Sequence, residues 1–129
     1  MLQVDHLDLN VSDLRQSEKF YDLIGPQLGL KKTLSSDDLI AYTDGFFGLY
    51  LVPSDMNRKF ASHGVGLNHL CFRADSREKV TAFFEFLTLH ECDVLKAPRE
   101  SGQYPEGYFS FFFRDPDRIR LEYAFCPRR

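Results

Sequence analysis

An internal repeat constrains the fold of this chain more than any other feature. A spacing of 63 residues places His6 on His69. At the same spacing and with no gap, the run Phe20-Tyr21-Asp22-Leu23-Ile24 falls on Phe83-Phe84-Glu85-Phe86-Leu87, and these positions match in chemical type. Repeats of this size are single supersecondary units that cannot bury their hydrophobic face alone. The sequence therefore predicts two copies of one half, which together form a single domain over residues 1–129.

The first half is predicted to be a strand, a helix and three further strands. Residues 4–11 alternate apolar and polar side chains, which is the period of a half-buried strand. Ser12 or Asp13 is a suitable N-cap for the helix that follows, and Gly25-Pro26 ends or kinks that helix. The three strands, with a tight turn at Asp44-Gly45, are expected at residues 31–35, 39–43 and 46–52.

The second half repeats this order. A strand over residues 67–74 precedes a helix that Ser76 caps, and the helix has an apolar stripe at helical spacing. Strands then follow at residues 93–97, 108–114 and 119–125, with a polar loop at 98–107. Each half is thus βαβββ: repeat one spans residues 1–53, a connector 54–66, and repeat two 67–126. The expected fold class is α+β, with one curved mixed sheet and the helices on its convex face.

Composition and charge exclude several classes of function. The net charge of −3 comes from interspersed charges without a basic run, so we expect no nucleic-acid partner. The apolar stretches are too short to cross a bilayer, and we expect no membrane partner. The three cysteines have no CxxC spacing, and the amino terminus does not resemble a signal peptide. These features predict a cytoplasmic protein with reduced thiols.

The strand alternation brings three potential metal ligands to one face of the predicted sheet. In the first strand the apolar side chains pack on the helices, which turns His6 to the concave side, and the repeat does the same for His69. In the last strand Glu122 lies on the non-aliphatic face, where a charge is costly unless it is paired, solvated or bound to a metal. Two imidazoles and one carboxylate are the ligand set of a facial triad with open coordination positions.

With these residues in place, the chain resembles the vicinal oxygen chelate superfamily. The resemblance is carried by the paired βαβββ halves, by His6 and His69, and by the ending Phe113-Arg114-Asp115-Pro116-Asp117-Arg118-Ile119-Arg120-Leu121-Glu122. It implies that His6, His69 and Glu122 hold a divalent ion (iron, manganese, zinc, nickel or cobalt). It also implies a small-molecule substrate that chelates the ion through neighbouring oxygens, and a homodimer, sometimes with sites built from both subunits.

Two positions depart from the family's pattern. A glyoxalase-like member offers a fourth ligand, a glutamate, where the repeat places Tyr50, whose phenol has an ordinary pKa near ~10 and ligates poorly unless it ionises. We therefore expect a three-ligand site of the dioxygenase or thiol-transferase pattern, or a lyase other than glyoxalase I. The second departure is Arg118, which stands at a turn position where the family usually has glycine.

Less specific interpretations compete with the metal site. His6 and His69 are compatible with satisfied core histidines, and Glu122 with a salt bridge to Arg120 or Arg73. Under these interpretations the chain is a metal-free small-molecule binding protein of the bleomycin-resistance type, in which a dimer presents aromatic grooves. A regulatory or scaffolding module is a third possibility that no sequence feature favours.

No catalytic residue is identified by the sequence. The candidates are Tyr50, Tyr104 and Tyr108, because they lie on or near the elements that carry the predicted ligands. Tyr108 and Phe112 share one parity of a phenylalanine-rich strand, and this parity is expected to give the pocket an aromatic wall. The glycine-containing loop at residues 98–107 is expected to border that pocket.

Overall fold

The structure, a computed structural model, describes residues 1–56, 58–102 and 105–127 of the chain. The candidate Tyr104 lies outside the described residues. The chain consists of two compact units, which are Met1–Lys59 and Phe60–Arg129. The boundary between them falls inside the predicted connector. Each unit contains one of the predicted repeats.

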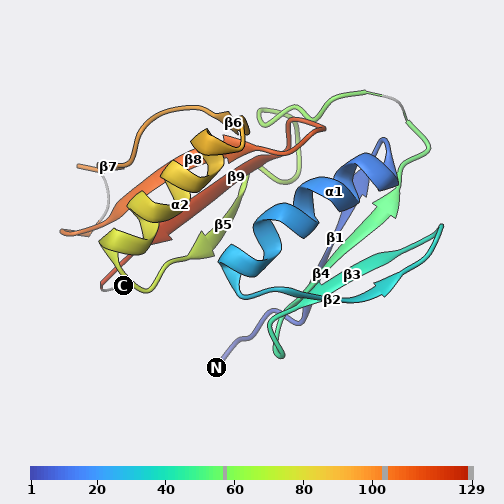
Figure 1. Cartoon of the computed structure of the whole chain (residues 1–129), viewed down its shortest axis with the longest axis horizontal. Helices are drawn as coiled ribbons and strands as arrows, with labels where there is room; N and C mark the ends of the chain where they lie inside the picture. Colours follow the sequence, from blue (N-terminus) through green and yellow to red (C-terminus); the bar gives the residue numbers. More distant parts are fainter. Residues whose placement is uncertain (57, 103–104, 128–129) are drawn as a thin grey trace. The chain divides into compact units, whose positions relative to one another are not determined.

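The first unit is a four-stranded mixed sheet with one long helix (Figure 1). Its sheet order is β1-β4-β3-β2, in which β1 and β4 run parallel and the other neighbours antiparallel. Its elements are β1 (His6–Val11), α1 (Leu14–Ile24), the 3-10 helix η1 (Gly25–Leu28), β2 (Lys31–Ser35), β3 (Ile40–Thr43) and β4 (Gly48–Pro53). Gly25-Pro26 ends the α-helix as predicted, because η1 begins there.

The second unit repeats this arrangement with one addition. Its elements are β5 (Leu70–Arg73), α2 (Arg77–Leu89), β6 (Asp93–Val94), β7 (Arg99–Glu100), β8 (Phe109–Arg114) and β9 (Arg120–Phe125). The sheet order is β5-β9-β8-β6, and β5 and β9 are again parallel. The short strand β7 lies inside the predicted loop, because Arg99 and Glu100 pair with Ser110 and Phe109 of β8.

The predicted α+β class and the two-repeat organisation are confirmed. The strands pair into two mixed sheets, one in each unit, whereas the sequence predicted one continuous curved sheet. β1 and β5 stand at the ends of their sheets, each next to its parallel partner. Alternation along a strand predicts which side chains share a face, but it does not determine which backbone edges become paired. Within the described part of the chain, no helix is long and apolar enough to span a membrane.

The two repeats agree in register at their helices and parallel strands. Asp13 caps α1 and Ser76 caps α2, and both caps and both helix starts are 63 residues apart. In the parallel strands Asp8 pairs with Tyr50, and at the equivalent place Cys71 pairs with Glu122. Tyr50 is therefore the repeat counterpart of Glu122, as the sequence predicted.

The buried faces of the two helices coincide at their ends and differ in the middle. Ser17 and Ile24 of α1 are buried, as are their counterparts Val80 and Leu87 of α2. Between them α1 buries Tyr21 and leaves Phe20 half-buried, whereas α2 buries Phe83 and leaves Phe84 half-buried. Phe83 takes the central place because it packs against Phe113 and Tyr123, with ring centroids 5.5 and 4.9 Å apart.

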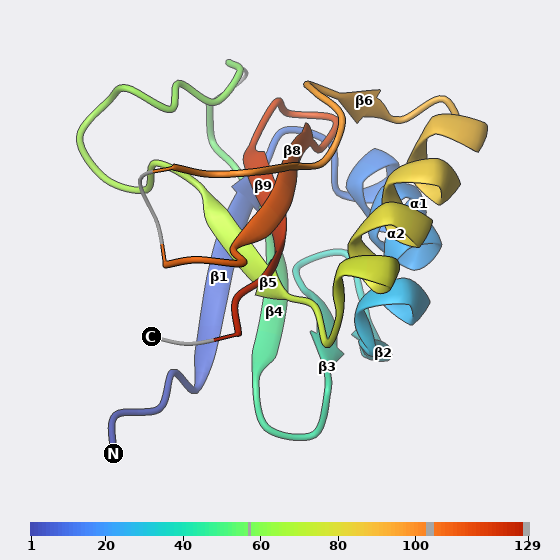
Figure 2. The same ribbon diagram turned by 90° about the vertical axis from the view of Figure 1, so that its left-hand side faces the viewer.

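Strand alternation separates the helix-covered face of each sheet from the other face. In β1, Leu9 and Val11 are buried and Leu7 is half-buried, while His6, Asp8 and Asn10 on the other face are exposed, so the strand has the two faces that alternation predicted. In the second unit α2 lies along one face of its sheet (Figure 2). Tyr123 of β9 contacts α2, so its neighbour Glu122 is directed to the opposite face.

The Asp-Pro-Asp turn between β8 and β9 is held by its first aspartate. One carboxylate oxygen of Asp115 accepts hydrogen bonds from the backbone N–H groups of Asp117 and Ile119, both at 2.9 Å. Arg118 adopts φ 65°, the left-handed conformation that glycine tolerates best. This geometry explains why glycine suits the position, and it confines the departure at Arg118 to the turn.

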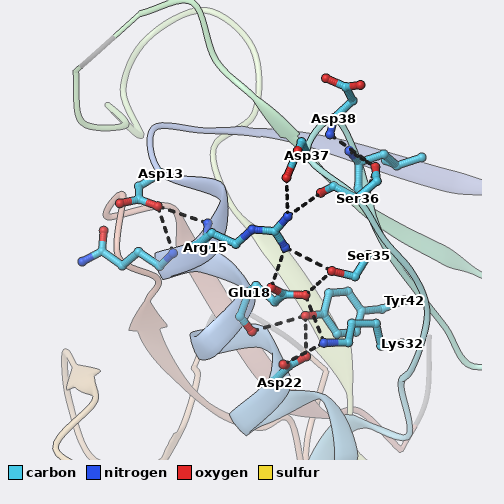
Figure 3. Close-up of polar contacts among 12 residues, drawn as sticks. Asp13, Arg15, Glu18, Asp22, Lys32, Ser35, Ser36, Asp37, Asp38 and Tyr42 are labelled. Carbon is cyan, nitrogen blue, oxygen red and sulfur yellow. Dashed lines mark hydrogen bonds and ion pairs between the residues drawn. The ribbon is translucent and has the colours of Figure 1, made fainter.

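A cluster of charged groups fastens α1 to strands β2 and β3 (Figure 3). The Glu18 carboxylate accepts hydrogen bonds from Ser35 at 2.6 Å, Arg15 at 2.9 Å and Lys32 at 3.0 Å. Lys32 also contacts Asp22 at 2.9 Å, as does the hydroxyl of Tyr42 at 2.8 Å. The hydrogen bond from Ser35, followed by those from the two cations, lowers the pKa of Glu18 to about 2.

We predict that Glu18→Gln lowers the free energy of unfolding by about 1–2 kcal/mol at pH 7, because it removes a charge that accepts three hydrogen bonds. A carboxyl group with a depressed folded-state pKa stabilises the fold above its unfolded pKa, and this stabilisation is lost as pH falls. The difference between wild type and variant should therefore shrink between about pH 5 and pH 2. Urea unfolding at several pH values measures it. Glu85→Gln, on the exposed side of α2, is the matched control and should have little effect.

Candidate metal centre

His69 is held in one orientation by the residue before it. Asn68 donates through its amide nitrogen to the Ser62 carbonyl at 3.2 Å, which turns its amide oxygen toward the ring. That oxygen lies 2.6 Å from His69 Nδ1, so Nδ1 carries a hydrogen and donates it. In the neutral imidazole the lone pair is then on Nε2. Metal-bound histidines are commonly oriented in this way by a carbonyl oxygen.

The free nitrogen of His69 faces a buried carboxylate. Glu122 is only 2% exposed, and its Oε2 lies 3.3 Å from His69 Nε2. Its other oxygen, Oε1, accepts a short hydrogen bond from the hydroxyl of Tyr108. A neutral imidazole lone pair and a carboxylate oxygen repel each other at this distance, so the arrangement requires a proton or a metal cation between them.

The spacing of these two atoms suits a shared metal ion. Nitrogen and oxygen ligands at about 2.0–2.2 Å from an ion, with an angle of roughly 90–109° between them, lie about 2.8–3.6 Å apart. The observed separation of 3.3 Å falls in that range. His69 and Glu122 therefore fit two positions of a divalent metal site.

The salt bridges proposed from sequence for Glu122 are not formed. Arg73 donates instead to the backbone carbonyl of Cys126 at 3.4 Å. The guanidinium of Arg120 lies over the ring of Phe112, 4.3 Å from its centroid. The partners of Glu122 are thus a neutral hydroxyl and an imidazole, and neither is a fixed cation.

Tyr108, one of the candidate catalytic residues, supports the carboxylate. Its side chain is buried, with its hydroxyl 4.0 Å from the Cys71 sulfur in addition to the bond with Glu122. Burial, and then the bond to Glu122, raise the pKa of Tyr108 well above its ordinary value. The phenol therefore stays protonated and acts as a hydrogen-bond donor that fixes Oε1.

His6 has the same local arrangement in the first unit. Its Nδ1 lies 2.6 Å from Oδ2 of Asp5, which is the repeat counterpart of Asn68. The bond to Asp5 is the main cause of a raised pKa for His6. The Nε2 atom is directed away from Asp5 and lies 3.9 Å from Oδ1 of Asp8. Both repeated histidines are thus oriented by the residue immediately before them.

Tyr50 occupies the place of Glu122 in the first unit but makes a different contact. Its ring stacks on the imidazole of His6, with centroids 5.1 Å apart and planes at 21°. Gly48 makes room for this ring, because a Cβ atom at that position would lie 2.8 Å from Tyr50 Cε1. The first unit therefore has an aromatic wall where the second has a carboxylate.

The structure thus brings three of the predicted residues together, namely His69, Glu122 and Tyr108. His6 and Tyr50 form a second group in the other unit. Among residues 1–56, 58–102 and 105–127, no three side chains of His, Cys, Asp or Glu gather into one metal-binding group. Sequence reasoning missed Asp5 and Asn68, although an oxygen-bearing side chain before each repeated histidine was a visible signal.

A pocket of about 510 Å³ adjoins Glu122 in the second unit. It lies between β8, β9 and the segment that contains β7, as predicted for the 98–107 loop. Its lining is formed by Leu95, Lys96, Ala97, Arg99, Glu100, Ser101, Gly102, Ser110, Phe111, Phe112, Arg120 and Glu122. A small molecule in this pocket would lie next to the carboxylate.

We predict that Asp5→Asn lowers the pKa of His6 toward the ordinary value of about 6.5, because the variant removes both the charged hydrogen-bond acceptor and its negative field. NMR titration of the imidazole protons measures this pKa. Asp8→Asn is the matched control: it removes the same charge at 3.9 Å without a hydrogen bond, and should lower the pKa less. Equal effects of the two variants would contradict an Nδ1–Asp5 hydrogen bond.

Comparisons with known proteins agree with this architecture. The family profile described as "Glyoxalase/Bleomycin resistance protein/Dioxygenase superfamily" matches residues 3–123. The uncharacterized protein YqjT of Bacillus subtilis (strain 168) is 32% identical over 120 residues, covering 91% of this chain and 94% of that protein.

Solved structures show the same fold. A candidate glyoxalase from Bacillus halodurans superposes with a TM-score of 0.82 at 27% identity and 95% coverage of both chains. The fosfomycin resistance protein FosX from Listeria monocytogenes superposes with a TM-score of 0.74 at 18% identity, covering 98% of this chain and 94% of that one. At 18% identity the second likeness concerns the fold alone.

Proposed function

Because this chain belongs to the Glyoxalase/Bleomycin resistance protein/Dioxygenase superfamily, we propose that it is a metal-dependent enzyme. Its substrate is a small molecule that chelates the ion through two neighbouring oxygens. The observation that carries the proposal is the facing pair of His69 Nε2 and Glu122 Oε2, whose separation of 3.3 Å suits two ligands of one divalent ion. A buried carboxylate without a fixed cationic partner is costly unless an ion compensates its charge.

Two protein ligands and their supporting residues belong to the second unit. His69 contributes Nε2 because Asn68 occupies Nδ1, and Glu122 contributes Oε2 because Tyr108 occupies Oε1. Such supporting hydrogen bonds fix the tautomer of an imidazole and the direction of a carboxylate before the metal arrives. Nitrogen and oxygen ligands of this kind suit iron, manganese, zinc, nickel or cobalt.

The third ligand of the proposal is His6, by its repeat relation to His69. Its Nδ1 is bonded to Asp5, so Nε2 is the atom that ligates. Tyr50, the counterpart of Glu122, stacks on His6 and offers no fourth carboxylate. The ion therefore keeps open positions for substrate oxygens, and when bound it supplies Lewis-acid polarisation of those oxygens. A glyoxalase I activity, which in the family's pattern uses a fourth ligand, is not part of the proposal.

We propose that the protein forms a homodimer. His6 then comes either from the same chain as Glu122 or from the second copy. Mixing a His6→Gln variant with a Glu122→Gln variant separates these arrangements. If the sites are built across subunits, mixed dimers regain one intact site and bind metal. If each site lies within one chain, the mixture binds no better than the two variants alone.

We predict that calorimetric titration of the wild type with zinc, manganese and ferrous iron shows binding of at least one ion at micromolar affinity or better. Glu122→Gln retains the shape of the side chain and removes its charge, so it should weaken binding at least tenfold without unfolding the domain. Tyr50→Phe is the matched control, because it keeps the stacked ring on His6 and should leave binding unchanged. Since imidazole must be neutral to ligate and the pKa of His6 is raised, affinity should decrease as pH falls, beginning above the ordinary histidine pKa of about 6.5.

The opposite results are equally informative. If the wild type binds none of these ions and none co-purifies with protein prepared without chelator or affinity tag, the metal-dependent enzyme is excluded. A metal-free small-molecule binding protein then becomes the better account. If Glu122→Gln binds as well as the wild type, the ion is held elsewhere and the assignment of Glu122 is wrong.

A further inference from the structure

The second unit carries an arginine where the first carries a glycine. His6 pairs across the parallel strands with Gly48. In the second unit the parallel pairing begins at Leu70 and Leu121, and its continuation by one residue sets Arg120 opposite His69. Ala41 pairs with Tyr50 on the next strand, and its counterpart Phe112 pairs with Glu122. The same strands therefore form with glycine and alanine at these positions. The larger side chains Arg120 and Phe112 are additions that the fold itself does not require.

Arg120 lines the pocket and has a buried donor without a partner in the part of the chain that the structure describes. Its guanidinium lies over the ring of Phe112 at 4.3 Å, and both residues line the cavity of about 510 Å³ beside Glu122. The side chain is partly exposed, but its Nε atom is buried and has no hydrogen-bond partner among the described residues. A buried N–H of a cation that lacks an acceptor is costly, and an anionic ligand is the acceptor that removes the cost.

The other charges around the pocket leave it electropositive. Lys96 and Arg99 also line it, and neither makes an ion pair within the described part of the chain. The carboxylate of Glu100 is bound by Arg77 at 2.6 Å. The other lining carboxylate, Glu122, is bonded to Tyr108 and faces His69. No lining carboxylate is therefore paired with Arg120, and an anion that enters meets three cations.

We propose that this pocket binds an anionic group of the substrate, a carboxylate or a phosphate, with Arg120 as its main donor. This inference rests on the proposed function, which supplies the metal-chelating end of the substrate, and it adds an anionic group at the other end. Arg120 and Glu122 lie on one face of β9 two residues apart, about 7 Å along the strand. A short molecule therefore reaches both groups. The substrate class is a small anion that bears two neighbouring oxygens at its other end.

Metal-free protein tests the anion site by itself. In the presence of EDTA, inorganic phosphate is titrated while the Nε–Hε signal of Arg120 is followed by proton–nitrogen NMR. We expect a saturable downfield shift of this signal as Hε gains an acceptor. Arg120→Gln should weaken phosphate binding at least tenfold, as monitored on backbone signals of β8 and β9. Arg120→Lys, which keeps the charge but not the Nε donor, should bind with intermediate affinity.

Arg118→Gln is the matched control, because it removes the same charge from an exposed turn residue outside the pocket. It should bind phosphate as the wild type does, and circular dichroism confirms that all variants are folded. If phosphate produces no saturable shift at Arg120, the proposal is wrong. If Arg118→Gln weakens binding as much as Arg120→Gln, the attraction is general surface charge and the proposal is equally wrong.

A second measurement connects the anion site to the metal. Catechol and 3,4-dihydroxybenzoate share one pair of neighbouring oxygens and differ only in a carboxylate. With protein loaded with its tightest-binding ion, the carboxylate should improve affinity at least tenfold in the wild type and less than twofold in Arg120→Gln. If the proposed metal site is wrong, neither compound binds through its neighbouring oxygens, but phosphate still binds to the metal-free protein. If the proposed anion site is wrong, catechol and 3,4-dihydroxybenzoate both bind and do so with equal affinity.

Discussion

The interaction on which the rest of this site depends is the contact between the buried carboxylate of Glu122 and the imidazole of His69. Glu122 is placed on the face of β9 opposite α2, where its Oε1 is bonded by Tyr108 and its Oε2 faces His69 Nε2. Neither partner supplies a fixed positive charge. Burial of the Glu122 carboxylate is unfavourable unless a positive charge compensates it. Both this cost and the 3.3 Å separation of Oε2 from His69 Nε2 favour a metal ion between the two atoms.

The repeat gives the two units the same arrangement around their histidines. Each unit presents one histidine at the start of its first strand, and each histidine is oriented through Nδ1 by the preceding residue, Asp5 or Asn68. The fold needs the apolar residues of the helices and of the helix-covered sheet faces, and these are shared by the two units. The opposite faces are free to differ. In the first unit that face carries Gly48 and Tyr50, and in the second unit it carries Arg120 and Glu122.

This difference assigns separate roles to the two units. Tyr50 stacks on His6 and closes that position to a fourth carboxylate ligand. Arg120 lies on the ring of Phe112 beside a pocket with an excess of cations. Under the two proposals, a substrate would be selected both by its metal-chelating oxygens and by its anionic group, and two such features yield specificity without a large interface.

Much of the fold and part of the site followed from the sequence, because they depend on local periodicity. The spacing of 63 residues predicted the two helices, their caps and the equivalence of Tyr50 and Glu122. Alternation predicted that Leu9 and Val11 lie on the helix-covered face and that His6 lies on the opposite face. The pairing of strands into two sheets did not follow, nor did β7, because strand pairing depends on backbone edges that alternation does not specify. The central place of Phe83 rather than Phe84 depended on aromatic packing against β8 and β9.

The site shows the same division. The sequence by itself determined which side chains share a face: His69, Glu122, Phe112 and Arg120 belong to one parity of their strands whatever packs around them. Only the tertiary structure decided how they are used. It bonded Glu122 to Tyr108 rather than to Arg120 or Arg73, turned His69 Nε2 toward the carboxylate through Asn68, and left Arg120 Nε without an acceptor. Hydrogen-bond partners depend on distances of a few ångströms between separate strands, and a linear pattern contains no information about those distances.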